Sequence, residues 1–192
     1  MSEVYLKKAK KTPETGTSET RKIVERLLSE IEIGKETIAK KYASDLDGFN
    51  GDIIVSQESL ENASKMVSEK LKDDIKFAHE RIKKFAEAQK QSISEFETEL
   101  SPGLWAGQKL IPIQTAGCYV PGGRYAHVAS AIMSITTARV AGVENIIACS
   151  APKGEDGPNP AILYTMNYCG ADKILALGGV QAIASMAYGL FT

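Results

Sequence analysis

The chain has 192 residues, of which 43% are apolar and 24% charged, so it can bury the core of one sizeable or two small globular domains. Its net charge of −1 gives no electrostatic reason to expect a nucleic-acid or membrane-surface partner. No apolar run is long enough to span a bilayer and the Lys-rich N-terminus lacks the apolar core of a signal peptide, so we expect a cytoplasmic protein.

Residues 1–100 hold most of the lysine and glutamate and are predicted to form a helical segment. One apolar helix face is marked by the spacing of Ile23, Leu27 and Ile31. A second amphipathic run extends from about Ser56 to Gln91, with charged residues on its other faces. Because acids are interspersed with its lysines, we interpret this run as a solvated helix rather than a nucleic-acid surface.

Shorter pieces without a helical period lie around these runs. Residues 45–52 are predicted to form a polar loop punctuated by glycine, and residues 53–55 suit a short extended piece. Residues 101–116 are a connector with strand character, and we expect its lone Trp105 to be a packing residue.

Residues 101–192 alternate between strand and helix. Strand-like apolar runs cover 115–120, 145–150 and 173–177, and helical runs cover about 125–141, 160–169 and 180–188. Repeats of this length imply right-handed crossovers and a parallel sheet, and continuous apolar strands imply that both sheet faces are covered. We therefore predict an α/β fold in two parts, a helical segment followed by a sheet-forming part.

The three cysteines, Cys118, Cys149 and Cys169, lie far apart in apolar surroundings and lack CxxC spacing. We expect buried free thiols in a reducing compartment rather than a disulfide or a zinc site. With only two histidines, His79 and His127, the chain cannot build a His-rich metal cluster. His79 lies among charged residues and is expected to be a solvated helix residue.

The first strand of the second part ends in Tyr119-Val120-Pro121-Gly122-Gly123, ahead of a helix of small residues. Glycines let the backbone approach a ligand, proline fixes the turn, and the Tyr119 ring can lie against a flat group. No G-x-G-x-x-G fingerprint or P-loop is present, so a standard dinucleotide grip is not supported. On the pattern alone, ligand contact and an ordinary strand-to-helix turn stay equally open.

Three polar residues near glycine turns are candidates for ligand contact. Arg124 and His127 lie near the positive start of a helix, where a cation is unfavourable unless an anion or acid answers it. A solvated arginine and a packed neutral histidine are the alternative. Gln181 follows the related turn Gly178-Gly179 at a helix N-terminus, where its amide can donate and accept hydrogen bonds.

Several motifs together resemble the histidinol dehydrogenase family. They are Gly117-Cys-Tyr-Val-Pro-Gly-Gly123, Ala138-Arg-Val-Ala-Gly-Val143 and Gly178-Gly-Val-Gln-Ala-Ile-Ala184 followed by Ala187-Tyr-Gly189, with a similar helical N-terminal half. The resemblance implies an incomplete Rossmann-like parallel sheet, akin to aldehyde dehydrogenases. It also implies a zinc- and NAD-dependent homodimer that oxidises a primary alcohol through an aldehyde to a carboxylate in two hydride transfers. The family's NAD-contacting tyrosine and glutamine fall on Tyr119 and Gln181.

Within that family the chain looks closer to the sulfopropanediol dehydrogenase branch, whose members oxidise dihydroxypropanesulfonate to sulfolactate. The branch features are Arg124-Tyr125-Ala126-His127, the opening Tyr5-Leu6-Lys7-Lys8-Ala9, and Gly107-Gln108-Lys109. An anionic sulfonate suits a cationic turn, so Arg124 and His127 are expected to help set substrate choice. Oxidation of L-histidinol to L-histidine is the alternative reaction.

The family's zinc ligands and its Glu-His acid/base pair lie beyond the position that matches Thr192. The resemblance therefore assigns this chain no metal ligand and no catalytic residue, and we expect it to be inactive alone. The final residues, Ala187-Tyr-Gly-Leu-Phe-Thr192, together with an open sheet edge, predict an interrupted chain. A non-catalytic module that retains nucleotide binding or subunit association is the alternative class.

Overall fold

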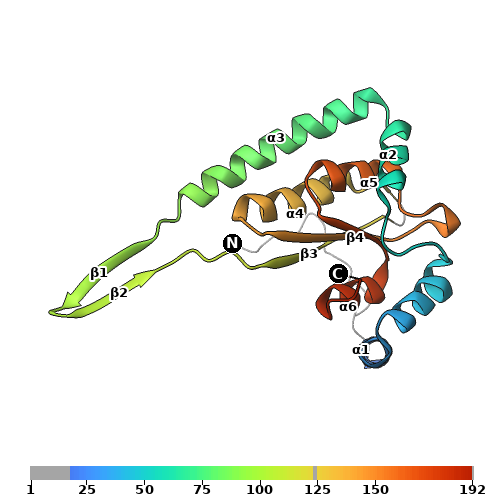
Figure 1. Ribbon diagram of the computed structural model, residues 1–192, viewed down its shortest axis with the longest axis horizontal. Helices are drawn as coiled ribbons and strands as arrows, with labels where there is room; N and C mark the ends of the chain where they lie inside the picture. Colours follow the sequence, from blue (N-terminus) through green and yellow to red (C-terminus); the bar gives the residue numbers. More distant parts are fainter. Residues whose placement is uncertain (1–17, 123–124, 192) are drawn as a thin grey trace, which may run out of the picture.

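A computed structural model describes residues 18–122 and 125–191 of the chain. A three-stranded parallel sheet lies between helices, and a two-stranded hairpin extends away from this body (Figure 1). The sheet comprises β3 (Thr115–Val120), β4 (Asn145–Ser150) and β5 (Lys173–Ala176), in the order β3-β4-β5. The α/β prediction is confirmed, and the three apolar runs form the strands that the sequence indicates.

Each strand is followed by a helix with recognisable end signals. These helices are α4 (Val128–Ala141), α5 (Pro160–Tyr168) and α6 (Gly179–Ala187). α4 ends at Gly142, whose φ of 95° suits glycine alone, and Asn159 caps α5 by accepting the Ala161 amide at 2.9 Å. α4 starts three residues later than expected, which leaves His127 at its N-cap rather than inside the helix.

β4 and β5 are buried on both faces because their side chains alternate between two apolar clusters, whereas the second face of β3 stays partly exposed. On one face, Cys118, Val120, Ile146, Ala148 and Ile174 pack with α4, α5 and helices of the N-terminal half. On the other face, Ile147, Cys149 and Leu175 pack with α6 and another N-terminal helix. The helical half and the sheet therefore share their cores.

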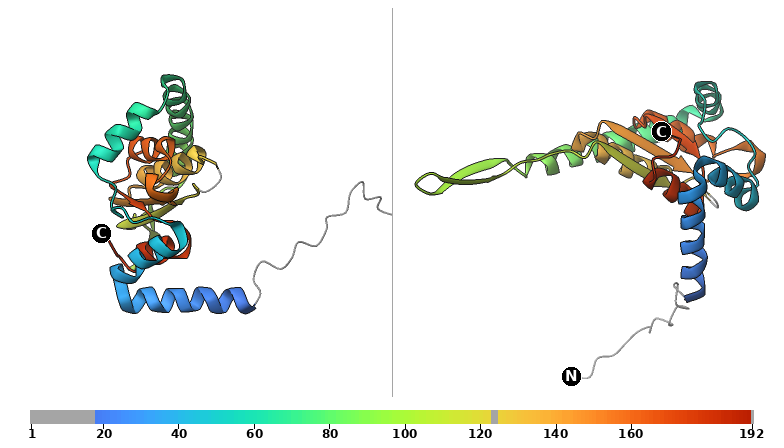
Figure 2. Two further views of the ribbon diagram at one scale, coloured as in Figure 1. Left: turned by 90° about the vertical axis from the view of Figure 1, so that its right-hand side faces the viewer. Right: turned by 60° about the horizontal axis from the view of Figure 1, so that its bottom comes forward.

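The N-terminal helices are α1 (Ser18–Asp47), α2 (Gln57–Met66) and α3 (Glu69–Gln91). The single run expected from Ser56 to Gln91 is broken at Val67-Ser68, because Ser68 caps a new helix and its hydroxyl accepts the Leu71 amide at 3.3 Å. α1 bends sharply at Lys35, where φ is 52° and ψ is −140° (Figure 2). Its last residue, Asp47, lies in the stretch that the sequence predicts as loop.

The extended piece at residues 53–55 adds to the β5 edge of the sheet. Val55 N donates to Ile174 O at 2.9 Å, and Ala176 N donates to Ile53 O at 2.8 Å. Ile54 and Leu175 form the antiparallel bridge between these segments. Among the described residues, β3 therefore keeps the unpaired edge of the sheet.

The hairpin consists of β1 (Phe96–Ser101) and β2 (Leu104–Gln108), and every residue in both strands is exposed. Trp105 is 56% exposed, so the expectation that it packs within this chain is wrong. The boundary drawn at residues 100 and 101 falls inside β1. No helix in the described ranges has the length and apolarity needed to cross a membrane.

Candidate functional site

Two glycine turns lie at the carboxyl ends of β3 and β5, and both approach the end of β4. A methyl group at Gly122 would lie 2.5 Å from Ser150 Oγ, and one at Gly178 would lie 2.6 Å from Ala151 Cβ. Both distances are too short for a side chain, so glycine is required where these turns contact Ser150 and Ala151. This edge is where open α/β sheets bind their ligands.

Tyr119 links the two turns across the sheet. It is half-buried near the end of β3, and its hydroxyl accepts the Gly179 amide at 3.4 Å. Tyr119 pairs with Cys149 in the ladder, so its side chain passes over β4 to reach the start of α6. The structure therefore brings the Tyr119 turn and the Gln181 turn together at one edge.

Gln181 directly follows the Gly178–Gly179 turn that the Tyr119 hydroxyl contacts, but this residue is only 2% exposed. Its Nε2 donates to Asp47 Oδ2 at 2.8 Å, and the Gly178 amide donates to the same oxygen at 3.3 Å. Asp47 is the site residue that sequence reasoning missed. The available signal was an acid directly before Gly48, at the end of an amphipathic run.

The two candidate substrate residues are less well placed. Arg124 lies outside the described residues. His127 is exposed at the N-cap of α4, and its side chain makes no capping hydrogen bond to the helix. Substrate contact by these residues stays a prediction.

Ser150 carries a polar atom without a hydrogen-bond partner at the same edge. The residue is fully buried, and its Oγ has no partner among the described residues. A buried hydroxyl in this state costs free energy unless something pairs with it. Gly122 packs against this hydroxyl, since a Cβ on Gly122 would lie 2.5 Å from it.

The three cysteines are buried and free, as the sequence predicts. Burial raises the pKa of the Cys149 thiol to about 12 and that of Cys169 to about 11. Burial also raises the pKa of Cys118, an effect that a hydrogen bond with Ser134 partly offsets. Because the thiolate is the reactive form, these cysteines are packing residues rather than nucleophiles.

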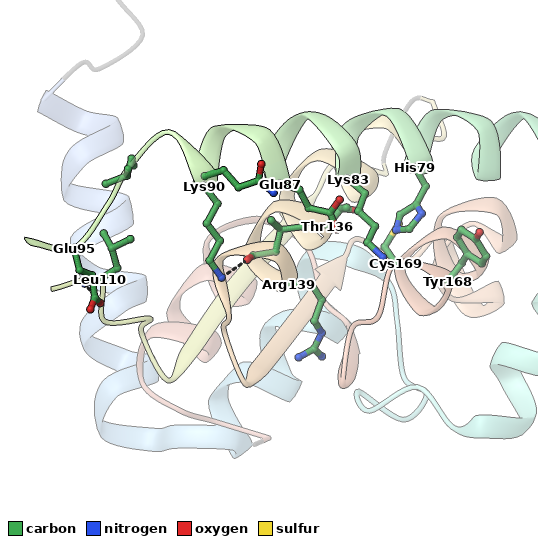
Figure 3. A pocket seen from close by; sticks show the side chains of 13 residues that line it. His79, Lys83, Glu87, Lys90, Glu95, Leu110, Thr136, Arg139, Tyr168 and Cys169 are labelled. Atoms are coloured by element: carbon green, nitrogen blue, oxygen red, sulfur yellow. Dashed lines mark hydrogen bonds between the residues drawn. The ribbon is translucent and has the colours of Figure 1, made fainter.

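A cleft of about 940 Å³ lies elsewhere, between α3 and α4 (Figure 3). Two cations that line the cleft make hydrogen bonds to other parts of the chain. Lys90 Nζ donates to Val140 O at 2.9 Å, and Arg139 donates to Gly170 O and to Asp172. His79 is half-buried there and packs edge-on against Tyr168, with ring centroids 5.1 Å apart, so it is less solvated than predicted. The cleft contains none of the predicted ligand residues.

The comparisons with known proteins agree with this architecture. The family model described as histidinol dehydrogenase matches residues 10–192. The chain belongs to the histidinol dehydrogenase family.

The relatives that resemble this chain are longer than the chain itself. A histidinol dehydrogenase homolog from Pelagibacter ubique is 56% identical over the whole chain, which covers 45% of that protein. A sulfopropanediol 3-dehydrogenase from Ruegeria pomeroyi is 51% identical over 97% of the chain and 43% of its own length. The crystal structure of histidinol dehydrogenase from Elizabethkingia anophelis superposes with a TM-score of 0.86 at 31% identity, covering 94% of this chain and 41% of that one. The chain thus spans less than half the length of these relatives.

Proposed function

We propose that this chain is the cofactor-binding part of an NAD-dependent dehydrogenase that oxidises a primary alcohol through an aldehyde to a carboxylate. The observation that carries the proposal is the hydrogen bond between the Tyr119 hydroxyl and the Gly179 amide. It sets two glycine turns side by side at the sheet edge where α/β folds bind nucleotides. Membership of a dehydrogenase family supports the reaction class.

The residues at this edge fit a dinucleotide. The half-buried Tyr119 ring offers a flat face, and its hydroxyl lies at the Gly179 amide, where backbone comes close to the edge. The start of α6 at Gly179 adds the positive end of a helix, which favours a phosphate. NAD, when bound, supplies the hydride acceptor. We assign cofactor contact to Tyr119 and to the turn that contains Gln181.

The described residues offer no comparable site for zinc. Within residues 18–122 and 125–191, no three His, Cys, Asp or Glu side chains are grouped to hold a metal ion. We therefore assign no zinc ligand and no catalytic base to the described residues. We propose that these groups belong to the part of the full-length enzyme that this chain does not span, and that the chain alone binds NAD without turnover.

For the substrate we propose 2,3-dihydroxypropane-1-sulfonate, oxidised to sulfolactate, ahead of L-histidinol. The chain is 51% identical to a protein named sulfopropanediol 3-dehydrogenase, against 31% to a histidinol dehydrogenase of known structure. Arg124 and His127 follow the Pro121-Gly122 turn in the sequence, and a cationic or protonatable group there suits a sulfonate. These two residues are our candidates for substrate contact.

Three measurements test these proposals. Isothermal titration of the 192-residue chain with NAD should give saturable binding, and an absence of heat would refute cofactor binding by this part.

In the full-length enzyme, the sulfonate should drive NADH formation more efficiently than histidinol. Arg124→Ala should raise the KM for the sulfonate while leaving that for an uncharged diol unchanged. An unchanged KM for the sulfonate would remove Arg124 from the substrate site.

We also propose that the full-length protein is a homodimer and that the β1–β2 hairpin is part of its interface. By alternation and register, Phe96, Thr98, Leu104 and Ala106 share one face of the hairpin, and Glu97 and Glu99 lie on the other. An isolated two-stranded hairpin is marginally stable in water, and this one exposes 55% of Phe96 and 56% of Leu104. A second copy that covers the apolar face would remove this exposure.

The buried free thiols also support the cytoplasmic location that we propose. All three cysteines are unpaired in the structure. Free buried cysteines are typical of proteins in a reducing compartment.

A further inference from the structure

Asp47 joins the end of α1 to the start of α6 through a single oxygen atom. Asp47 Oδ2 accepts hydrogen bonds from Gln181 Nε2 and from the Gly178 amide, at 2.8 and 3.3 Å. The carboxylate and the glutamine are 134 residues apart in the chain, and α1 packs along α6. Gln181 is almost fully buried, so Asp47 is the group that satisfies its Nε2.

The same contacts define the shape of the nucleotide edge. Gly179 has a φ of 55°, and a Cβ on it would lie 3.0 Å from Gln181 Oε1, so the amide packs directly beneath the turn. The next contact outward is the Gly179 amide, which donates to the Tyr119 hydroxyl. A continuous path of contacts therefore runs from Asp47 through Gln181 and Gly179 to Tyr119.

We propose that Asp47 is a positioning residue: it holds the Gln181 amide beneath the Gly178–Gly179 turn, so that the turn and Tyr119 present one fixed surface to the nucleotide. This inference rests on the proposed NAD site. Asp47 acts as a hydrogen-bond acceptor rather than as a charge, since both of its bonds are made by one oxygen. The carbonyl oxygen of an asparagine in the same place accepts both bonds.

Three substitutions separate this role from a general effect on folding. Asp47→Asn keeps the acceptor, Asp47→Ala removes it, and Asp45→Ala removes an exposed carboxylate two residues earlier on the same helix. We expect Asp47→Ala to weaken NAD binding about tenfold, because about 1.4 kcal/mol is within the range of one hydrogen bond. Asp47→Asn and Asp45→Ala should stay within about twofold of the wild-type affinity, because about 0.4 kcal/mol corresponds to a factor of two.

A double-mutant cycle shows whether Asp47 acts through Gln181. If it does, Asp47→Ala costs little further affinity in a Gln181→Ala background. An equal loss in both backgrounds would overturn the proposal, because the two residues would then act independently. A loss with Asp47→Asn as large as that with Asp47→Ala would also overturn it, because the charge rather than the acceptor would matter.

A spectroscopic readout keeps the inference testable when NAD does not bind, an outcome that would refute the proposed function alone. In ¹⁵N spectra of the unliganded chain, the Gln181 side-chain amide should give dispersed, slowly exchanging signals. Asp47→Ala should move them to the position of a solvated glutamine, and Asp47→Asn should leave them dispersed. Unmoved signals in Asp47→Ala would show that Asp47 does not position Gln181.

Discussion

Tyr119 and Gly179 are separated by 60 residues, yet the tyrosine hydroxyl accepts the glycine amide at 3.4 Å. The contact ties the end of β3 to the start of α6 across β4, which lies between β3 and β5 in the sheet. Tyr119 lies two residues before the Pro121-Gly122 turn, and Gly179 belongs to the Gly178–Gly179 turn, so the contact sets the two turns side by side. A nucleotide bound at this edge, as we propose, would meet both turns.

Removing the Tyr119 hydroxyl should weaken nucleotide binding, because the two turns lose the hydrogen bond that holds them together. We expect Tyr119→Phe to lower NAD affinity by about 3- to 10-fold, because one hydrogen bond of about 0.5–1.5 kcal/mol is lost. Titration calorimetry measures the affinity, and thermal unfolding by circular dichroism measures the stability. Tyr125→Phe, at an exposed tyrosine that follows the same turn, is the matched control. Equal affinities for Tyr119→Phe and the wild type would argue against a cofactor role for this hydroxyl.

The tight contact between Gly178 and Ala151 gives a steric prediction. Gly178→Ala places a methyl group 2.6 Å from Ala151 Cβ, so the turn must shift. We expect a loss of about 1–3 kcal/mol in the free energy of unfolding, as for other overpacked sites. Adding Ala151→Gly removes the opposing methyl and should recover part of that loss. Urea denaturation measures both variants, and a double variant no more stable than Gly178→Ala would contradict this cause.

Much of the sheet could be predicted from the sequence, because a buried parallel strand is a continuous apolar run whose ends are set by polar or glycine residues. β3 and β4 begin and end where those runs do, and β5 ends one residue early. The contacts of residues 53–55 with β5 could not be predicted, because they join segments about 120 residues apart and leave no local signal. Asp47 was missed for the same reason: its role depends on Gln181, and its own neighbours indicate only a polar loop.

The candidate site was predicted unevenly. Tyr119 and Gln181 were singled out by turn chemistry and by resemblance, and the structure places both at one edge. The burial of Gln181 could not be anticipated, because a polar side chain at a helix start is normally solvated and only a tertiary partner removes it from water.

The break between α2 and α3 was visible in principle, since Ser68 followed by Glu69 is a helix-start pattern.

The backbone at Lys35 predicts an unusual ranking of substitutions. Its φ of 52° with ψ of −140° is a conformation that glycine adopts far more readily than other residues. In an ordinary helix interior alanine is more stable than glycine by about 0.5–1 kcal/mol. At position 35 we expect the reverse, with Lys35→Gly more stable than Lys35→Ala by about 1 kcal/mol. Both variants lose the contact between the Lys35 ammonium and the Tyr188 ring, so this contact does not affect the difference in stability between them.

Denaturant titrations of the two Lys35 variants give this difference directly. The same pair of substitutions at Lys22, an exposed helical position in the first half of α1, should show the ordinary preference for alanine. Alanine that is more stable than glycine at both positions would show that the bend does not strain the backbone in solution.

His79 predicts a dependence of stability on pH. Burial lowers the pKa of His79, Lys83 lowers it further, and Glu80 opposes them. The folded state therefore disfavours the protonated form relative to the unfolded chain, whose histidine pKa is about 6.5. The stability that depends on neutral His79 is present above that value and is lost as the pH falls through the lower folded pKa.

We therefore expect the free energy of unfolding to fall between about pH 7.5 and pH 5, and His79→Gln to make this fall smaller. His127→Gln, at the other histidine and in an exposed position, should leave the fall unchanged. Urea midpoints measured across the range give both slopes. With only two histidines in the chain, proton NMR also resolves each pKa. A His79 pKa at or above its ordinary value would contradict the stated cause.

The apolar face of the hairpin offers a direct test of self-association. If a second copy covers this face, the mass measured by analytical ultracentrifugation should rise from that of one chain to that of two as concentration rises. Leu104→Glu places a charge on the apolar face and should abolish this rise, because a buried unpaired charge is costly. Thr98→Ser on the same face is a mild control that should preserve it. A full-length dimer unaffected by Leu104→Glu would place the interface elsewhere.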